Sequence, residues 1–132
     1  MMVKFVDIET PYAAPDNEGV KRNVRYARAC ARDCLQRGEI PYASHLFFPQ
    51  PGILDDNIPG EREMGIRAGK EIIEKLEATT VVYTDLGVSR GMQFGIDIAA
   101  QKGRRVERRQ LGPNWEEEFA RHEGDHSHNC VW

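Results

Sequence analysis

The sequence predicts an α/β fold in which a mainly parallel sheet carries helices on both faces. Short apolar segments rich in β-branched residues alternate along the chain with longer segments whose apolar residues recur every three or four positions. This β-α-β-α-β-α-β order requires crossover connections, which are right-handed and place helices against a parallel sheet. A chain of 132 residues is large enough for one domain with a single core.

The first part of the chain predicts a strand, a helix and a second strand. Residues 3–8 are short, apolar and β-branched, as in a buried strand. After a loop rich in turn residues, apolar positions form one stripe of an amphipathic helix. These positions are Val20, Val24, Ala27, Ala31 and Cys34. Gly38 has the place of a helix C-cap, and residues 39–46 are the second predicted strand.

The second part predicts a long loop, two helices and two strands. Residues 47–59 contain three prolines and an Asp-Asp-Asn cluster, which predict an irregular loop of the kind that often has a function. Apolar periodicity predicts helices at residues 60–78 and 91–102, with a strand at 79–84 between them. Residues 104–110 form a charged strand, which is typical of a sheet edge.

The predicted α/β domain spans residues 1–111, and residues 112–132 form a C-terminal tail. The tail begins with a short acidic helix at residues 115–121 and then is expected to be mobile or docked on a partner subunit through its aromatic residues. It crowds four potential metal ligands into a short stretch: His122, His126, His128 and Cys130. Structural zinc sites bring paired ligands from two segments, so we expect no metal here. Cys30 and Cys34, four apart on a helix, are expected to be core residues rather than a disulfide.

Composition and charge narrow the classes of function. The net charge of −3 gives no general basic field, so we expect no nucleic acid polymer as partner, although one local site can hold a free nucleotide. No apolar stretch approaches the length of a membrane span and no signal peptide is recognisable, which predicts a cytoplasmic protein with no membrane partner. No P-loop, GxGxxG, GxSxG or HExxH motif occurs, and no cofactor is expected.

The candidate site lies where the loops after successive parallel strands meet. Ligands of such sheets bind beyond the carboxyl ends of the strands. The loops at residues 9–19, 45–60 and 85–91 bring together polar and aromatic groups from distant parts of the chain. These groups are Glu9, Tyr12, His45, Asp55, Asp56, Asp85, Ser89 and the backbone amides near Gly91. Asp55 and Asp56, next to Asn and Pro, are also typical turn residues.

Each of these candidates also has a purely structural interpretation. Ser89 is placed to cap the next helix, and the same capped N-terminus with Gly91 also favours a phosphate or carboxylate. Asp85 either faces the ligand or accepts hydrogen bonds from loop amides. His45 either contacts the ligand or satisfies backbone carbonyls, and Tyr12 either stacks on a base or covers the sheet edge. The sequence alone leaves these alternatives open.

Several motifs taken in order resemble one enzyme family. They are a strand followed by TPYAA, Asn23 and Tyr26 on the first helix, PYASHLFFPQ with His45, LDDNIPGERE with Asp55, Asp56, Glu61 and Arg62, and TDLGVSRGM before the third helix. Over residues 3–109 the chain resembles the nucleoside 2-deoxyribosyltransferase-like superfamily, in particular its small phage and bacterial branch. The resemblance implies a Rossmann-like or flavodoxin-like three-layer fold with a mainly parallel sheet of about four or five strands.

The resemblance also implies an activity and a set of binding residues. Characterised relatives cleave the N-glycosidic bond between base and sugar through a glutamate that attacks the anomeric carbon, as hydrolases or transferases. A nucleoside or nucleotide would then be the ligand, and a homodimer or larger homo-oligomer the expected assembly. The implied substrate-binding positions are Tyr12, His45, Asp55, Asp56, Arg62, Gly87, Ser89, Gly91 and Met92.

One position departs from the pattern of that family. The family carries glutamate four residues after the glycine at position 91, where this chain has Gly95. Asp97 is rotated from that position by about 200° on a helix and cannot replace it. The candidate catalytic carboxylates are therefore Asp85, Glu9 and Glu61, although Glu61 beside Arg62 is also typical of a helix start.

Three classes of function remain open on the sequence. The first is an N-glycosidase or deoxyribosyltransferase with an unusual carboxylate. The second is a nucleotide-binding protein, or a receptor for a nucleotide-derived signal, that has lost the family glutamate. The third is a structural or adaptor domain that reuses the fold, because fold alone does not determine function.

Overall fold

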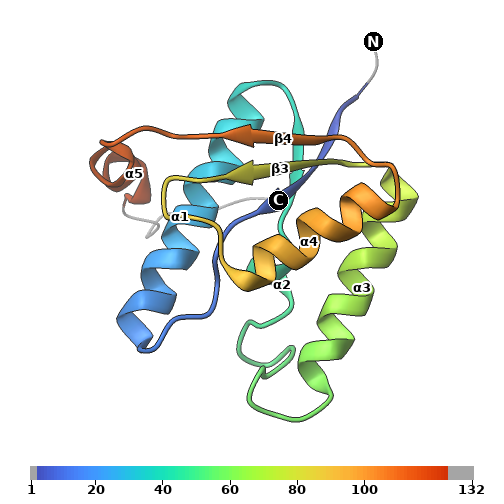
Figure 1. The fold of residues 1–132 in the computed structure, drawn as a ribbon. Helices are drawn as coiled ribbons and strands as arrows, with labels where there is room; N and C mark the ends of the chain where they lie inside the picture. Colours follow the sequence, from blue (N-terminus) through green and yellow to red (C-terminus); the bar gives the residue numbers. More distant parts are fainter. Residues whose placement is uncertain (1–2, 125–132) are drawn as a thin grey trace, which may run out of the picture.

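The computed structural model of the protein describes residues 3–124 and contains a four-stranded sheet in the order β2-β1-β3-β4 (Figure 1). The strands are β1 (Phe5–Glu9), β2 (Ile40–Tyr42), β3 (Thr79–Tyr83) and β4 (Val106–Arg109). Every neighbouring pair is parallel. The predicted α/β class and parallel sheet are confirmed, and the charged strand β4 does lie at an edge of the sheet.

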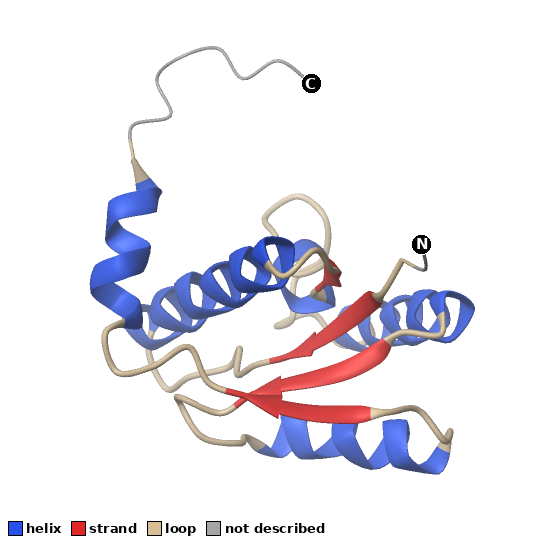
Figure 2. Cartoon of the chain, turned by 90° about the horizontal axis from the view of Figure 1, so that it is seen from above, coloured by secondary structure: helices blue, strands red, loops and turns tan. Residues whose placement is uncertain are grey.

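The strands lie between helices, as Figure 2 shows, which gives the three layers of a Rossmann-like or flavodoxin-like fold. The helices are α1 (Asn17–Gln36), α2 (Ser44–Phe47), α3 (Glu61–Leu76), α4 (Arg90–Gln101) and α5 (Trp115–Glu123). No helix of residues 3–124 is both long enough and apolar enough to cross a membrane.

The side chains of β1 divide between two different environments because they alternate along the strand. Val6 and Ile8 belong to the buried cluster that contains Cys30 and Cys34 of α1. The two cysteines are fully buried and unpaired, so their predicted place in the core is confirmed. Asp7, between the two apolar residues, belongs to the opposite face.

Local signals explain where the main helices begin and end. Asp16 caps α1 by accepting a hydrogen bond from the Gly19 amide at 2.7 Å, and Ser89 caps α4 by accepting one from the Met92 amide at 3.2 Å. Gly38 follows α1 with a φ of +79°, the left-handed conformation that favours glycine after a helix. The predicted helix limits are therefore close to the observed ones.

The predicted strand at residues 39–46 is wrong in its second half. β2 ends at Tyr42, and the chain turns at once into the short helix α2. The reason is close packing on α3: a Cβ atom on Gly69 would lie 2.9 Å from Cβ of Ser44. The glycine lets α2 approach α3, and the segment leaves the sheet to make that contact. The loop predicted at residues 47–59 is irregular, with several turns, as expected.

The first part of the predicted tail docks on α1 of the same chain. The rings of Tyr26 and Trp115 pack edge to face with centroids 4.9 Å apart, and Trp115 is buried. Arg25 of α1 donates to Glu123 at 2.7 Å and lies over the Phe119 ring. Trp115 and Phe119, which we expected to contact a partner subunit, thus pack on α1 of the same chain, and contact with a partner subunit stays a prediction. Predictions for His126, His128, Cys130 and Trp132 lie outside the described residues.

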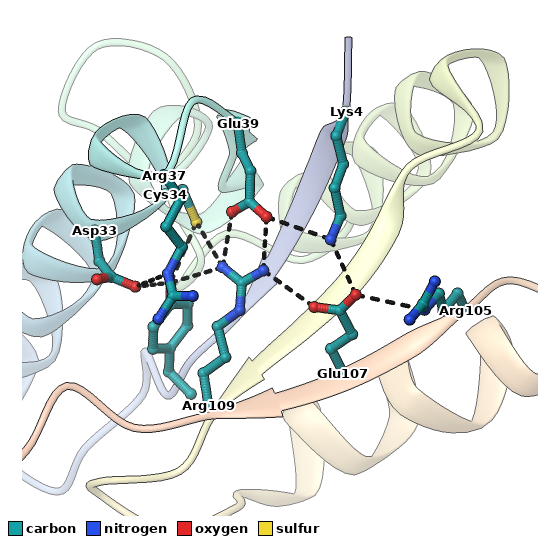
Figure 3. A network of polar contacts seen from close by, with 9 residues as sticks. Lys4, Asp33, Cys34, Arg37, Glu39, Arg105, Glu107 and Arg109 are labelled. Atoms are coloured by element: carbon teal, nitrogen blue, oxygen red, sulfur yellow. Dashed lines mark hydrogen bonds and ion pairs between the residues drawn. The ribbon is translucent and has the colours of Figure 1, made fainter. Parts of the chain in front are cut away.

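A polar network ties β4 to the starts of β1 and β2 (Figure 3). Arg109 donates to both carboxylate oxygens of Glu39 at 2.7 Å, and to Glu107 at 3.0 Å. Lys4 joins the two acids, at 3.3 Å from Glu39 and 2.9 Å from Glu107. Arg109 holds the pKa of Glu39 down at about 2, and Lys4 adds to this effect although burial opposes it. The paired charges of this network thus connect strand β4 with the segments where β1 and β2 begin.

Candidate functional site

The strand order places a crevice between β1 and β3, where the chain changes its direction of winding across the sheet. Ligands of open α/β sheets bind at this kind of switch point, outside the carboxyl ends of the strands. Here the end of β1 borders a cavity of about 510 Å³, walled by α3 and α4. We call it the inner cavity. Much of its wall is apolar: Ile66, Ile73, Phe94 and Ile98.

Two neighbouring carboxyl groups of β1 line the inner cavity. Asp7 and Glu9 are two residues apart on a strand, so their side chains share the face toward α3 and α4. Asp7 is 5% exposed and accepts a hydrogen bond from the Thr80 hydroxyl at 3.4 Å. Burial raises the pKa of Asp7 to about 6, although Arg104 and Thr80 oppose the shift.

The pKa of Glu9 is raised further, to about 9. Burial is the main cause, and the nearby Asp7 carboxylate adds to it, while Arg104 has the opposite effect. The pair therefore retains a proton near neutral pH, and Glu9, whose pKa is raised further, is the group that favours holding it. A neutral acid beside an ionised one gives this cavity both a proton donor and a negative charge.

Glu9 occupies the space that a side chain at position 95 would need. The Glu9 carboxyl carbon lies 2.6 Å from the point where a Cβ atom on Gly95 would be, and its Oε2 atom is closer still. Such distances are impossible between real atoms, so any side chain at position 95 would displace Glu9. Gly95 of α4 is thus what lets the carboxyl of β1 enter the cavity.

A histidine and a threonine form another part of the wall. Nε2 of His45 lies 2.6 Å from the Thr10 hydroxyl oxygen, and Thr10 is buried. Burial lowers the pKa of His45 to about 4, so the imidazole is neutral at physiological pH. Tyr12 packs edge-on to the His45 ring with centroids 6.3 Å apart. The wall thus offers neutral polar groups and an aromatic ring.

Four cationic side chains also line the inner cavity: Arg62, Lys70, Arg90 and Arg104. Lys70 of α3 lies over the ring of Phe94 of α4, with its ammonium 4.6 Å from the ring centroid. Nε of Arg104 is buried and, among the described residues, has no hydrogen-bond partner. The cavity therefore combines apolar walls, two acids and an excess of cations.

A second, more open groove of about 880 Å³, which we call the outer groove, adjoins the inner cavity. It lies between residues 12–20 and 49–61, and it shares Tyr12 and Asp56 with the inner cavity. The Asp55 carboxylate accepts from the Asn57 amide at 2.9 Å, and Glu61 accepts from the Asp55 amide at 2.9 Å. Asp55 and Glu61 therefore order the loop and lie in the outer groove, away from Glu9.

Most of the predicted site residues meet in the inner cavity. Its lining includes Glu9, Tyr12, His45, Asp56, Arg62, Ser89, Gly91 and Met92. Ser89 caps α4, as its structural interpretation predicted, and it also lies on the wall of the inner cavity. Gly87, with a φ of +84°, belongs to the turn after β3 and lines neither the inner cavity nor the outer groove.

Asp85, expected at the centre of the site, lies elsewhere. Its carboxylate accepts hydrogen bonds from the Tyr26 hydroxyl at 2.5 Å and from the Leu111 and Gly112 amides at 2.9 Å. Although burial opposes ionisation, these hydrogen bonds hold the pKa of Asp85 below its usual value. The loop-amide interpretation thus describes the observed position, because the carboxylate joins the end of β3 to the segment before α5.

Asp97 behaves as the helix geometry predicts. It is exposed, accepts a hydrogen bond from the Gln93 side chain at 2.9 Å and does not line the cavity. Sequence reasoning missed other polar and aromatic lining residues, including Asp7, Thr10, Lys70, Arg90, Phe94 and Arg104. Asp7 had a usable signal, since a carboxylate inside the apolar strand segment is unusual and shares a face with Glu9. Residues 3–124 place no group of three or more His, Cys, Asp or Glu side chains to hold a metal ion.

Comparison with known families places most of the chain in a family. The model of a family described as a domain of unknown function (DUF7768) matches residues 4–109. The chain belongs to the DUF7768 family. The matched part of this DUF7768 protein includes all four strands and every residue that lines the inner cavity, whereas α5 follows it. No curated protein matches the chain.

Proposed function

We propose that this DUF7768 protein is a nucleoside or nucleotide N-glycosidase or deoxyribosyltransferase that acts in the inner cavity. The observation that carries the proposal is the Glu9 carboxyl lodged over Gly95. The resemblance to the 2-deoxyribosyltransferase-like superfamily calls for a glutamate side chain from position 95. Here β1 supplies a carboxyl group beside position 95, at the point where the Cβ atom of a side chain there would lie. Glu9 is therefore our candidate for a catalytic carboxyl group at this position, in the role of an acid rather than of the attacking glutamate.

The two carboxyl groups of β1 suit cleavage of a base–sugar bond. As the C1′–N bond breaks, positive charge develops on the sugar and its electron pair moves to the base. Ionised Asp7 would stabilise the sugar cation, and protonated Glu9 would give its proton to the leaving base. Water, or a second base in a transferase, would then bond to C1′ and return a proton to the Glu9 carboxylate. The acid is thereby regenerated.

A second function is favoured by the same burial of Glu9. A carboxyl that keeps its proton at neutral pH cannot attack a sugar, but it can donate a hydrogen bond. Within the described residues, no carboxylate of α4 lines the inner cavity. The protein would then bind a nucleotide or nucleotide-derived signal without turnover.

An assay of base release separates the two functions. The protein is incubated with a panel of nucleosides and 5′-nucleotides, and free base is measured by chromatography. We expect release by the wild type and a loss of about a hundredfold or more in Glu9→Gln. Glu61→Gln, in the outer groove, is the matched control and should keep the activity.

Each other outcome has a distinct meaning. Release that persists in Glu9→Gln would exclude Glu9 as the catalytic acid. No release, together with a ligand-induced rise in melting temperature, would favour binding without turnover. No release and no rise across the panel would contradict a nucleoside site.

The assembly and location implied by the resemblance belong to the same proposal. A homodimer or larger homo-oligomer in the cytoplasm, where nucleotides are available, would agree with it. Light scattering at micromolar concentration tests the assembly, and a monomer would contradict it.

A further inference from the structure

We propose that the ligand of the inner cavity carries a phosphomonoester bound by Arg62, Lys70 and Arg90. The inference rests on the proposed function for the nucleoside part of the ligand. It adds that the substrate class is a nucleotide rather than a nucleoside, and it assigns the residues that select it.

The three cations surround the cavity from two helices. Arg62, Ile66 and Lys70 follow one another at intervals of four residues on α3, so they form one row that lines the cavity. Arg90 begins α4 on the other wall. Side chains from facing walls can contact one anionic group together, and an arginine fork matches two phosphate oxygens.

These cations have no acidic partner in the part of the chain that the structure describes. None of the ion pairs within residues 3–124 involves Arg62, Lys70 or Arg90. Cations elsewhere, such as Arg67, are also absent from these ion pairs, so what distinguishes Arg62, Lys70 and Arg90 is that they line one cavity together. A set of unpaired cations around one cavity is available to an anion.

The contact between Lys70 and Phe94 indicates how the site could accept that anion. It joins α3 to α4 across the cavity, with Phe94 still 54% exposed. A cation–π contact at an exposed site is weaker than a charge-assisted hydrogen bond. A phosphate would therefore draw the ammonium away from the ring and leave the Phe94 face free for a base.

The balance of charge inside the cavity also favours an anion. Its lining contains four cations, Arg104 included, against the carboxyl groups of Asp7, Glu9 and Asp56. Burial keeps Glu9 protonated at neutral pH, which leaves an excess of positive charge. A phosphomonoester, which carries close to two negative charges at neutral pH, would offset that excess.

Titration calorimetry with matched ligand pairs tests the proposal. The probes are four 2′-deoxynucleosides and their 5′-monophosphates, and the proteins are the wild type, Lys70→Gln, Arg90→Gln and Arg67→Gln. Arg67 is the control because it is exposed on α3 and does not line the cavity. We expect the monophosphate to bind at least about tenfold more tightly than its nucleoside. Lys70→Gln and Arg90→Gln should each remove most of that advantage, and Arg67→Gln should keep it.

The outcomes distinguish this inference from the proposed function. Equal affinity for both members of every pair would overturn the phosphate site and leave a nucleoside site in place. If no pair binds, the proposed function fails, and inorganic phosphate decides the phosphate site. A rise in wild-type melting temperature with millimolar phosphate that is absent in Lys70→Gln would support it, and no rise would overturn it.

Discussion

The Glu9 carboxyl carbon lies 2.6 Å from the point that a Cβ atom on Gly95 would occupy. The space between β1 and α4 at this point therefore has room either for the Glu9 side chain or for a side chain at position 95, but not for both. In this chain the strand supplies the side chain and the helix supplies a glycine. The acid of the inner cavity is therefore held by the rigid end of a central strand.

The first prediction concerns the space shared by Glu9 and Gly95. Gly95→Ala should displace the Glu9 carboxyl, which is the far end of a flexible side chain, and should therefore cost only about 1 kcal/mol or less. In Glu9→Gly the same Gly95→Ala change should be harmless, since the obstacle is gone. Urea unfolding of the four proteins gives the coupling between the two positions.

Gly91→Ala is the control for the effect of alanine in α4. A Cβ atom on Gly91 would meet nothing closer than the Ser89 hydroxyl oxygen at 4.0 Å. Alanine favours a helix over glycine, so this variant should be as stable as the wild type or more stable. If Gly95→Ala were equally well tolerated, the close packing of Glu9 on α4 would be wrong.

The second prediction is a loss of stability with rising pH that depends on Glu9. The pKa of Glu9 is raised to about 9 in the folded protein, so between about pH 5 and 9 the folded state binds more protons than the unfolded state. The free energy of unfolding should fall through this range, by up to about 1.4 kcal/mol per pH unit for one proton. Glu9→Gln should flatten the profile. Glu61→Gln should keep the wild-type slope, and a wild type without that slope would refute the buried acid.

The third prediction concerns acid conditions and His45. Burial lowers the pKa of His45 to about 4. Between about pH 6.5 and 4, therefore, this histidine is protonated in the unfolded state and neutral in the folded state. The contribution of neutral His45 to stability should therefore be lost as pH falls from about 6.5 to 4. His45→Gln, measured by thermal unfolding across this range, should show a smaller loss than the wild type. His122→Gln, at an exposed position of α5, serves as the control.

The fourth prediction assigns Asp85 a structural effect. Asp85→Ala removes the acceptor of the Leu111 and Gly112 amides, which should cost about 2–4 kcal/mol of stability and loosen α5. Asp97→Ala, which loses one exposed hydrogen bond, should stay within about 0.5 kcal/mol of the wild type. Urea unfolding and limited proteolysis measure both effects. A stable Asp85→Ala protein that no longer acts on nucleosides would instead restore a catalytic role for Asp85.

The fifth prediction tests the network of Figure 3. Arg109→Met removes the bidentate partner of Glu39, whose side chain is only 9% exposed. The unpaired acid should cost about 3 kcal/mol, with Lys4 limiting the loss. Arg108→Met, on the exposed side of the same strand, should be nearly neutral. Equal stability of the two variants would show that the ion pair contributes little.

Much of the fold could be predicted because its determinants are local. The change between strand and helix periodicity predicts the order of elements, and the charges of residues 104–110 predict an edge strand. The length of β2 could not be read in this way. It depends on the contact of Ser44 with Gly69, which are far apart in the chain.

By itself the sequence determined the α/β class, the parallel sheet and the loops that meet at its carboxyl edge. Tertiary structure decided which acids enter the cavity, because that depends on which side chains of β1 and α4 face each other. It placed Asp7 and Glu9 in the inner cavity and directed Asp85 to the amides of Leu111 and Gly112. Strand register and helix packing bring together residues that are far apart in the sequence. Local sequence patterns do not predict such contacts.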